Sequence, residues 1–139
     1  MRERSAETPI LVAGAGPRMP TLAAELADTI AFGLPPEADE HALADAVATV
    51  ERAASGRPGA LELSTNPLVV DDEPPPWTPS RLDIPALIAG GSVAVLTGSV
   101  QQMADRRRER RDRLGISYVC TSATYAEALA PVVAELAGT

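Results

Sequence analysis

The stretch Pro9-Ile-Leu-Val-Ala-Gly-Ala-Gly-Pro-Arg18 passes from a short apolar run into a turn that holds two glycines. The run 9–13 is too short and too rich in β-forming residues for a helix, and it predicts a buried strand. Apolar residues then recur at helical spacing from Met19 to Ala27, with no helix breaker between Thr21 and Asp28. The stretch therefore predicts one strand, loop and helix unit.

The same alternation continues along the rest of the chain. Further strands are predicted at 29–32, 61–70 and 116–121, and further helices at 38–54, 84–89, 99–113 and from 124 onward. A helix between successive strands implies right-handed crossovers and a parallel sheet. The fold class is therefore α/β with alternating βα units, in a single domain over 1–139.

Three segments depart from this regular pattern. Pro67 lies inside the third strand, where it removes a ladder donor and predicts a bulge or a sheet edge. The segment 71–82 holds four prolines around Trp77, which predicts a surface loop. The segment 93–96 is ambiguous between helix and strand.

Capping signals mark the ends of several helices. Asp83 precedes the short helix 84–89, and Ser99 with Gln102 has the form of a capping box. Gly115 is placed to end the helix that this box opens. Thr124 with Glu127 has the same capping-box form and predicts the start of the last helix.

Composition excludes several classes of function. A single Cys in 139 residues permits no intramolecular disulfide and no Cys-rich zinc site, and it favours a reducing cytoplasm. All 12 basic residues are Arg, so a Schiff-base lysine and a Walker lysine are both absent. A net charge of −7 disfavours nucleic acid as a partner. The charged residues 1–8 do not resemble a signal segment, and the apolar runs are shorter than a membrane span.

The loop Gly14-Ala15-Gly16-Pro17-Arg18 is the strongest candidate site. Glycines at a strand-to-helix junction allow a close approach to the backbone, and the helix start attracts a phosphate. Arg18 adds a charged donor for the same group. A tight turn that binds nothing explains the pattern equally well. A Rossmann fingerprint fails because Met19 stands where that motif needs Gly.

Other polar residues fit structural roles better than chemical ones. His41 opens an acidic helix and is predicted to be solvated, and one histidine predicts no metal site. Cys120 falls in an apolar strand, which predicts a buried and inert thiol. Ser64, Thr65 and Asn66 could face a ligand or satisfy a bulge at Pro67.

The run 106–113 holds six arginines interleaved with Glu109 and Asp112. The acidic residues stand three and four positions from arginines, so pairing along a solvated helix is the favoured interpretation. Few aromatic residues accompany the run, and we expect no stacking platform for nucleic acid.

Three stretches together resemble the luciferase-like monooxygenase family, and more closely its actinobacterial branch of deazaflavin (coenzyme F-420) dependent oxidoreductases. In order along the chain they are 9–19 with 22–24 and 27–28, then 96–99 with 103–106, then 110–119 with 129–138. The resemblance implies a TIM barrel that binds FMN or the deazaflavin F-420 at the carboxyl ends of its strands, with oxidoreductase or monooxygenase activity. It further implies that Gly14, Ala15, Gly16, Pro17 and Arg18 contact the cofactor phosphate.

The length of the chain limits what the resemblance implies. A (β/α)8 barrel takes about 250 residues, and the four expected strands resemble the second half of one. Exposed parallel edges in such a half-barrel favour a partner, either a second copy in a homodimer or a complementary half-barrel chain. A non-catalytic remnant or interaction module is the alternative to an oxidoreductase half, and a binder of another nucleotide or phosphometabolite at the same loop is a third possibility.

Overall fold

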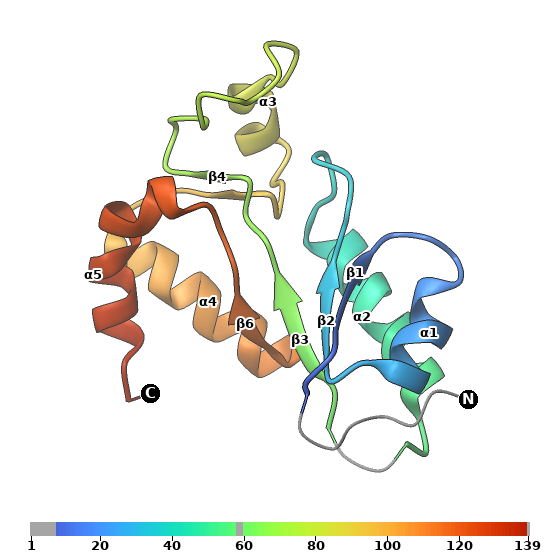
Figure 1. The fold of residues 1–139 in the computed structure, drawn as a ribbon. Coiled ribbons are helices and arrows are strands. Elements are labelled where there is room, and N and C mark those ends of the chain that lie inside the picture. The colour runs from blue at the N-terminus through green and yellow to red at the C-terminus, as the bar shows by residue number, and fades with distance from the viewer. Residues whose placement is uncertain (1–7, 58–59, 139) are drawn as a thin grey trace.

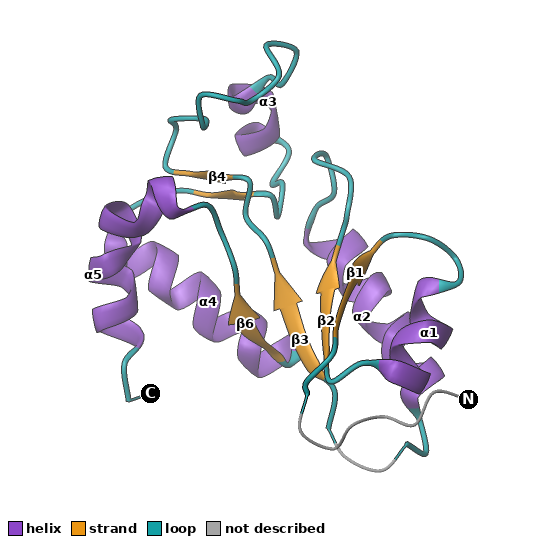
Figure 2. Cartoon of the chain, viewed as in Figure 1, coloured by secondary structure: helices purple, strands orange, loops and turns teal. Residues whose placement is uncertain are grey.

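The computed structural model describes residues 8–57 and 60–138, and the expected alternation of strands and helices is present there (Figures 1 and 2). The elements, in chain order, are β1 (Leu11–Gly14), α1 (Met19–Leu26), β2 (Thr29–Phe32), α2 (Glu40–Ala54), β3 (Glu62–Thr65), β4 (Val69–Val70), α3 (Ile84–Ala89), β5 (Val95–Leu96), α4 (Val100–Leu114), β6 (Ile116–Val119), the 3-10 turn η1 (Ala123–Tyr125) and α5 (Ala126–Leu136).

Four of the strands form one parallel sheet in the order β1-β2-β3-β6. Each strand therefore lies beside the strand that precedes it in this sheet. Because crossovers between parallel strands are right-handed, this order places the connecting helices on the same face. A parallel α/β sheet with alternating βα units, as the sequence predicts, is confirmed.

The principal core lies between this sheet and its helices. Val12, Ile30, Leu63 and Ile116 stand side by side across the four strands. They pack in one cluster with α1 and α2, whose buried side chains there include Ala23, Leu43, Val47 and Val50. The apolar residues that recur at helical spacing in 38–54 are thus the residues that α2 buries.

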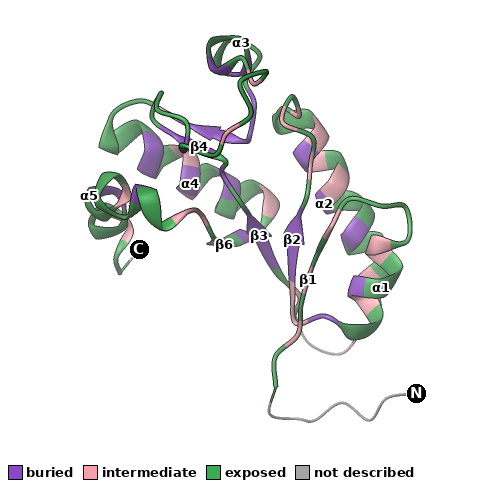
Figure 3. Ribbon diagram, turned by 45° about the horizontal axis from the view of Figure 1, so that its top comes forward, coloured by how far each residue is buried: buried purple, intermediate pink, exposed green. Residues whose placement is uncertain are grey.

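The opposite face of the sheet is exposed at its two edge strands and buried at its centre, where Ala31 and Ser64 lie. The neighbouring row on that face contains Ala13, Ala31, Ser64 and Tyr118. Tyr118 is 44% exposed, and Leu11, which shares the face, is 52% exposed. Figure 3 shows exposed and intermediate positions along β1 and buried positions along β2 and β3. Apolar side chains on this face therefore remain available for contact.

The predicted third strand 61–70 is divided in two, which corrects that expectation. β3 ends at Thr65, and β4 pairs in parallel with β5 in a second, two-stranded sheet. Pro67 has no N–H, and the N–H groups of Leu68 and Val69 both donate to the Ala94 carbonyl. The chain therefore leaves the main sheet at the proline, and the ambiguous segment 93–96 supplies the new partner strand.

An irregularity in the main sheet lies elsewhere than at Pro67. The register between β3 and β6 shifts between Leu63 and Ser64, which pair with Ile116 and Tyr118. Ser117 is the extra residue at this point. The expectation of a bulge or edge at Pro67 is therefore replaced by a break in the strand there and a bulge on β6.

The cap predictions succeed for two helices and fail for the last one. Asp83 accepts a hydrogen bond from the Ala86 N–H, and the reciprocal capping box of Ser99 and Gln102 is formed. Gly115 ends α4 in the left-handed conformation at φ 70°. The Thr124 box is wrong: Ser122 caps η1 by accepting from the Thr124 N–H, and α5 begins without a side-chain cap.

The proline-rich segment 71–82 runs largely over the surface, as predicted, and one hydrogen bond fastens its start. The Tyr125 hydroxyl donates to the Glu73 carbonyl at 2.7 Å. Burial raises the pKa of this phenol. Within the described ranges, the helices are too short or too polar to cross a membrane.

Candidate functional site

The loop from Gly14 to Arg18 joins the carboxyl end of β1 to the start of α1. Ala15, Gly16, Pro17 and Arg18 are all exposed there. The Met19 N–H donates to the Gly16 carbonyl at 3.0 Å, which closes the turn. In α/β folds, ligands bind at this carboxyl edge of the strands. The predicted site residues therefore lie together at the edge where such sites occur.

The start of α1 is left without a side-chain cap. Arg18 occupies the N-cap position, and its side chain makes no capping hydrogen bond. Pro20 stands in the first turn and contributes no N–H. The helix start thus has its positive dipole end facing solvent beside an exposed guanidinium. This arrangement favours an anion in front of the loop.

Neither Gly14 nor Gly16 is required by the fold. A Cβ on Gly16 would meet no atom within 4 Å, and one on Gly14 would lie 3.6 Å from the Met19 side chain, an ordinary contact. Neither residue has a positive φ. Alanine at either position would therefore be compatible with the backbone conformation of this turn. Glycine at such a site leaves the backbone accessible to a ligand.

Gly33 differs from these two glycines because the fold requires it. Its N–H donates to the Gly14 carbonyl at 3.1 Å. A Cβ on Gly33 would lie 3.1 Å from the Gly14 carbonyl carbon, which is backbone and cannot swing aside. Gly33 thus allows the carboxyl ends of β1 and β2 to approach closely. Sequence reasoning used Gly33 only as a strand end and missed this role.

A small pocket lies at the same edge beside the loop. Its volume is ≈ 190 Å³, and its lining includes Phe32, Gly33, Thr65, Asn66 and Ala94. None of the residues 15–18 lines it. The structure therefore brings Asn66 and Thr65 to the pocket, and the predicted phosphate loop lies one strand away. Gly33 directly follows a predicted strand, and this position in the sequence could have identified it and its neighbours as pocket residues.

The three polar residues of β3 and its end have different surroundings. Ser64 is buried, and its hydroxyl has no hydrogen-bond partner. Thr65 lies on the helix side, where its hydroxyl accepts a hydrogen bond from Arg107 at 3.2 Å. Asn66 is exposed. The backbone carbonyl of Pro67 accepts a hydrogen bond from Thr121 Oγ1 and not from any of these three side chains.

His41 is exposed, as predicted, with Nε2 3.5 Å from a carboxylate oxygen of Asp45. The prediction of a buried Cys120 is wrong, because the thiol is exposed. The strand β6 ends at Val119, one residue before the cysteine. Among the described residues, no three His, Cys, Asp or Glu side chains gather as they would around a metal ion.

The arginine helix α4 is only partly the solvated helix that the sequence predicts. Arg108 pairs with Asp105, and Arg113 with Glu109, at the expected spacing. Arg107 and Arg110 are instead buried, at 7% and 3% exposure. Arg110 Nε donates to Glu40 Oε1 of α2 at 2.8 Å. The prediction of a wholly solvated run therefore fails at the two positions that face the rest of the molecule.

The chain matches no family model and no curated protein.

Proposed function

We propose that this chain is the C-terminal half of a luciferase-like flavin or deazaflavin oxidoreductase that keeps part of the cofactor phosphate site. The proposal rests on the resemblance of the three stretches described above. The consecutive order of the parallel strands supports it, since consecutive order with helices on one face is the arrangement of a (β/α)8 barrel. The strands β1, β2, β3 and β6 would then be the fifth to eighth strands of such a barrel.

The observation that carries the phosphate site is the pair of glycines that the fold does not need. Gly14 and Gly16 keep the backbone open, and Ala15 and Pro17 complete the exposed turn. Arg18 adds a charged donor next to the uncapped start of α1. These five residues would hold the phosphate of FMN or of F-420. The cofactor, when bound, would supply the hydride or oxygen chemistry, and the protein would position and shield it.

Titration of the purified chain with FMN and with F-420 tests this site. We expect binding of at least one of them, and we expect Arg18→Ala to weaken it by about tenfold or more, the loss typical of a charged hydrogen bond. Arg113→Ala is the matched control, because Arg113 is exposed on α4 and pairs only with Glu109 among the described residues. Absence of binding up to about 1 mM would overturn the proposal of a retained site.

A second function, a non-catalytic module that dimerises or pairs with a separate half-barrel chain, is favoured by the partly exposed sheet face. Leu11 and Tyr118 are exposed there, and β1 and β6 are the two edges of the sheet. Exposed edges of a parallel sheet are templates for association. Reduction of a bound cofactor by the isolated chain would exclude this alternative.

A further inference from the structure

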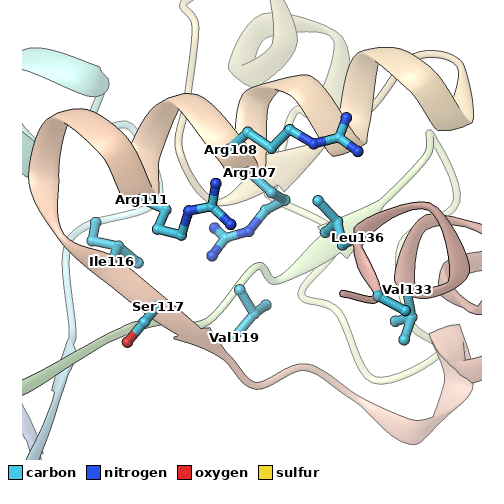
Figure 4. Close-up of a pocket in the computed structure, with 9 residues that line it drawn as sticks. Arg107, Arg108, Arg111, Ile116, Ser117, Val119, Val133 and Leu136 are labelled. Atoms are coloured by element: carbon cyan, nitrogen blue, oxygen red, sulfur yellow. The ribbon is translucent and has the colours of Figure 1, made fainter. Parts of the chain in front are cut away.

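A second pocket lies on the helix side of the sheet, bounded by α4, β6 and α5 (Figure 4). Its volume is ≈ 420 Å³, within the usual range of small-molecule sites. It opens beside the first residues of β6 and the last residues of α5. The pocket is therefore remote from the loop 14–18, which follows the carboxyl end of β1.

Arg107 is the buried cation of this pocket. It is 7% exposed, and Figure 4 shows its guanidinium directed into the space between Arg111 and Val119. A guanidinium carries five N–H donors. One of them is used by the Thr65 hydroxyl at 3.2 Å. Among the described residues, no carboxylate lies within ion-pair distance of Arg107.

The acidic side chains nearby are already paired with other arginines. Glu40 accepts from Arg110, and Arg108 is 3.0 Å from Asp105 and 3.4 Å from Glu135. Burial and the Arg110 charge lower the pKa of Arg107 to about 10, against an opposing effect of the Glu40 charge. Arg107 is therefore still charged at neutral pH, and a bound anion would supply a counter-charge within the pocket.

The remaining walls of the pocket are apolar. They comprise the side chains of Ile116, Val119, Val133, Leu136 and Ala137, together with the small polar Ser117. Val133 is 63% exposed. A ligand that fits this lining has one charged end for the arginine and an aliphatic body for the valines and the leucine.

We propose that this pocket binds a small organic acid, with its carboxylate on Arg107 and its aliphatic chain against Val119, Val133 and Leu136. The planar guanidinium matches a carboxylate with two parallel hydrogen bonds. Arg108 and Arg111 also line the pocket, but each pairs with a carboxylate, Arg108 with Asp105 and Arg111 with Asp112, so Arg107 is the residue assigned to the ligand.

Calorimetric titration with octanoate tests the proposal, with octanol and inorganic phosphate as the comparison probes. We expect octanoate to bind more tightly than either one, because octanol lacks the charge and phosphate lacks the apolar body. Equal binding of octanol would overturn the role of Arg107. Binding of phosphate alone would overturn the organic-acid assignment, and so would no binding of octanoate up to about 1 mM.

Variants then place the ligand in the pocket. Arg107→Met keeps an unbranched apolar stem and removes the charged guanidinium, and we expect a loss of affinity of about ten- to a hundredfold. Arg113→Met, on the exposed side of the same helix, is the matched control and is expected to change nothing. Unchanged octanoate binding by a folded Arg107→Met protein would contradict the proposal.

A second variant, which leaves every charge in place, tests the proposal even if the Arg107→Met protein does not fold. Ser117 is exposed and lines the pocket, so Ser117→Leu changes the pocket lining and leaves its three arginines in place. We expect it to lower octanoate affinity and to leave binding of FMN or F-420 unchanged. The two proposals therefore succeed or fail separately, since one set of variants lies in this pocket and the other at residues 14–18.

Discussion

At the residue scale, the three glycines at the carboxyl edge of the sheet separate structure from function. Gly33 is held against the Gly14 backbone, where an added Cβ would be 3.1 Å from a carbonyl carbon. Gly16 has open space around its Cβ direction and no positive φ. Gly33 is thus explained by packing, whereas Gly16 has no packing role and leaves the backbone open to the bound group that we propose.

Alanine at these two positions should have opposite effects. Gly16→Ala should leave the protein as stable or more stable by about 0.4–1 kcal/mol, because it restricts the unfolded chain. Gly33→Ala should cost about 1–3 kcal/mol through overpacking. Urea unfolding measures both, and cofactor titration of Gly16→Ala should show weaker binding. A Gly16→Ala protein that is destabilised would mean that the turn itself needs the glycine.

A second prediction concerns the buried arginine that joins two helices. Arg110 of α4 is 3% exposed and donates to Glu40 of α2, so Glu40→Gln leaves a buried cation without its counter-charge. We expect a loss of about 1–3 kcal/mol in the free energy of unfolding. Glu109→Gln breaks an exposed pair with Arg113 on the same helix and should cost less than about 0.5 kcal/mol. Equal losses would show that Arg110 does not depend on Glu40.

At the scale of the element, a local capping pattern is neither necessary nor sufficient to start a helix, since α1 and α5 begin without a side-chain cap. The two sequences Ser99 to Gln102 and Thr124 to Glu127 have the same form. The first is a true box at the start of α4, whereas the second begins inside the 3-10 turn that Ser122 caps. The second helix start is displaced because η1 precedes it and buries Tyr125 in a cluster with Leu96 and Met103.

Removal of the two hydroxyls tests this difference between helices. Ser99→Ala should destabilise the protein by about 1 kcal/mol, the usual cost of an N-cap. Thr124→Ala removes only an exposed contact with the Ser122 hydroxyl, and should cost a few tenths of a kcal/mol, about the effect of an ordinary surface change. Thermal unfolding of the two variants side by side measures the difference. A larger loss for Thr124→Ala would show that this residue caps α5 after all.

At the scale of the whole molecule, the two faces of the main sheet differ in how far other elements cover them. Helices pack against the face with Val12, Ile30, Leu63 and Ile116, and the other face keeps Leu11 and Tyr118 exposed. Both edge strands, β1 and β6, are short, at four residues each. Short edges limit aggregation, but an apolar face on a parallel sheet favours a partner.

We therefore predict that the chain self-associates through the partly exposed face. Sedimentation of the purified protein should give a dimer, and the double variant Leu11→Lys with Tyr118→Lys should shift it to monomer, because two charges per copy would be buried in the interface. Trp77→Lys is the control, since Trp77 is 66% exposed in the proline-rich loop away from the sheet. A monodisperse monomer for the unmodified chain would contradict this prediction.

The sequence alone determined the class of fold and most of its elements. Apolar spacing, glycines and prolines act within a few residues, so the strand at 29–32, the helix at 84–89 and the end of α4 at Gly115 were all predictable. The same local signals put the loop 14–18 at a strand-to-helix junction.

Only the tertiary structure decided which side chains are buried and which strands pair. β4 leaves the main sheet because its partner Val95 comes from a segment 26 residues further along the chain than Val69. Arg107 and Arg110 are buried because α4 packs against β3 and α2, and Cys120 is exposed because β6 ends one residue earlier. Burial and pairing depend on contacts between distant segments, and no local pattern of residues specifies them.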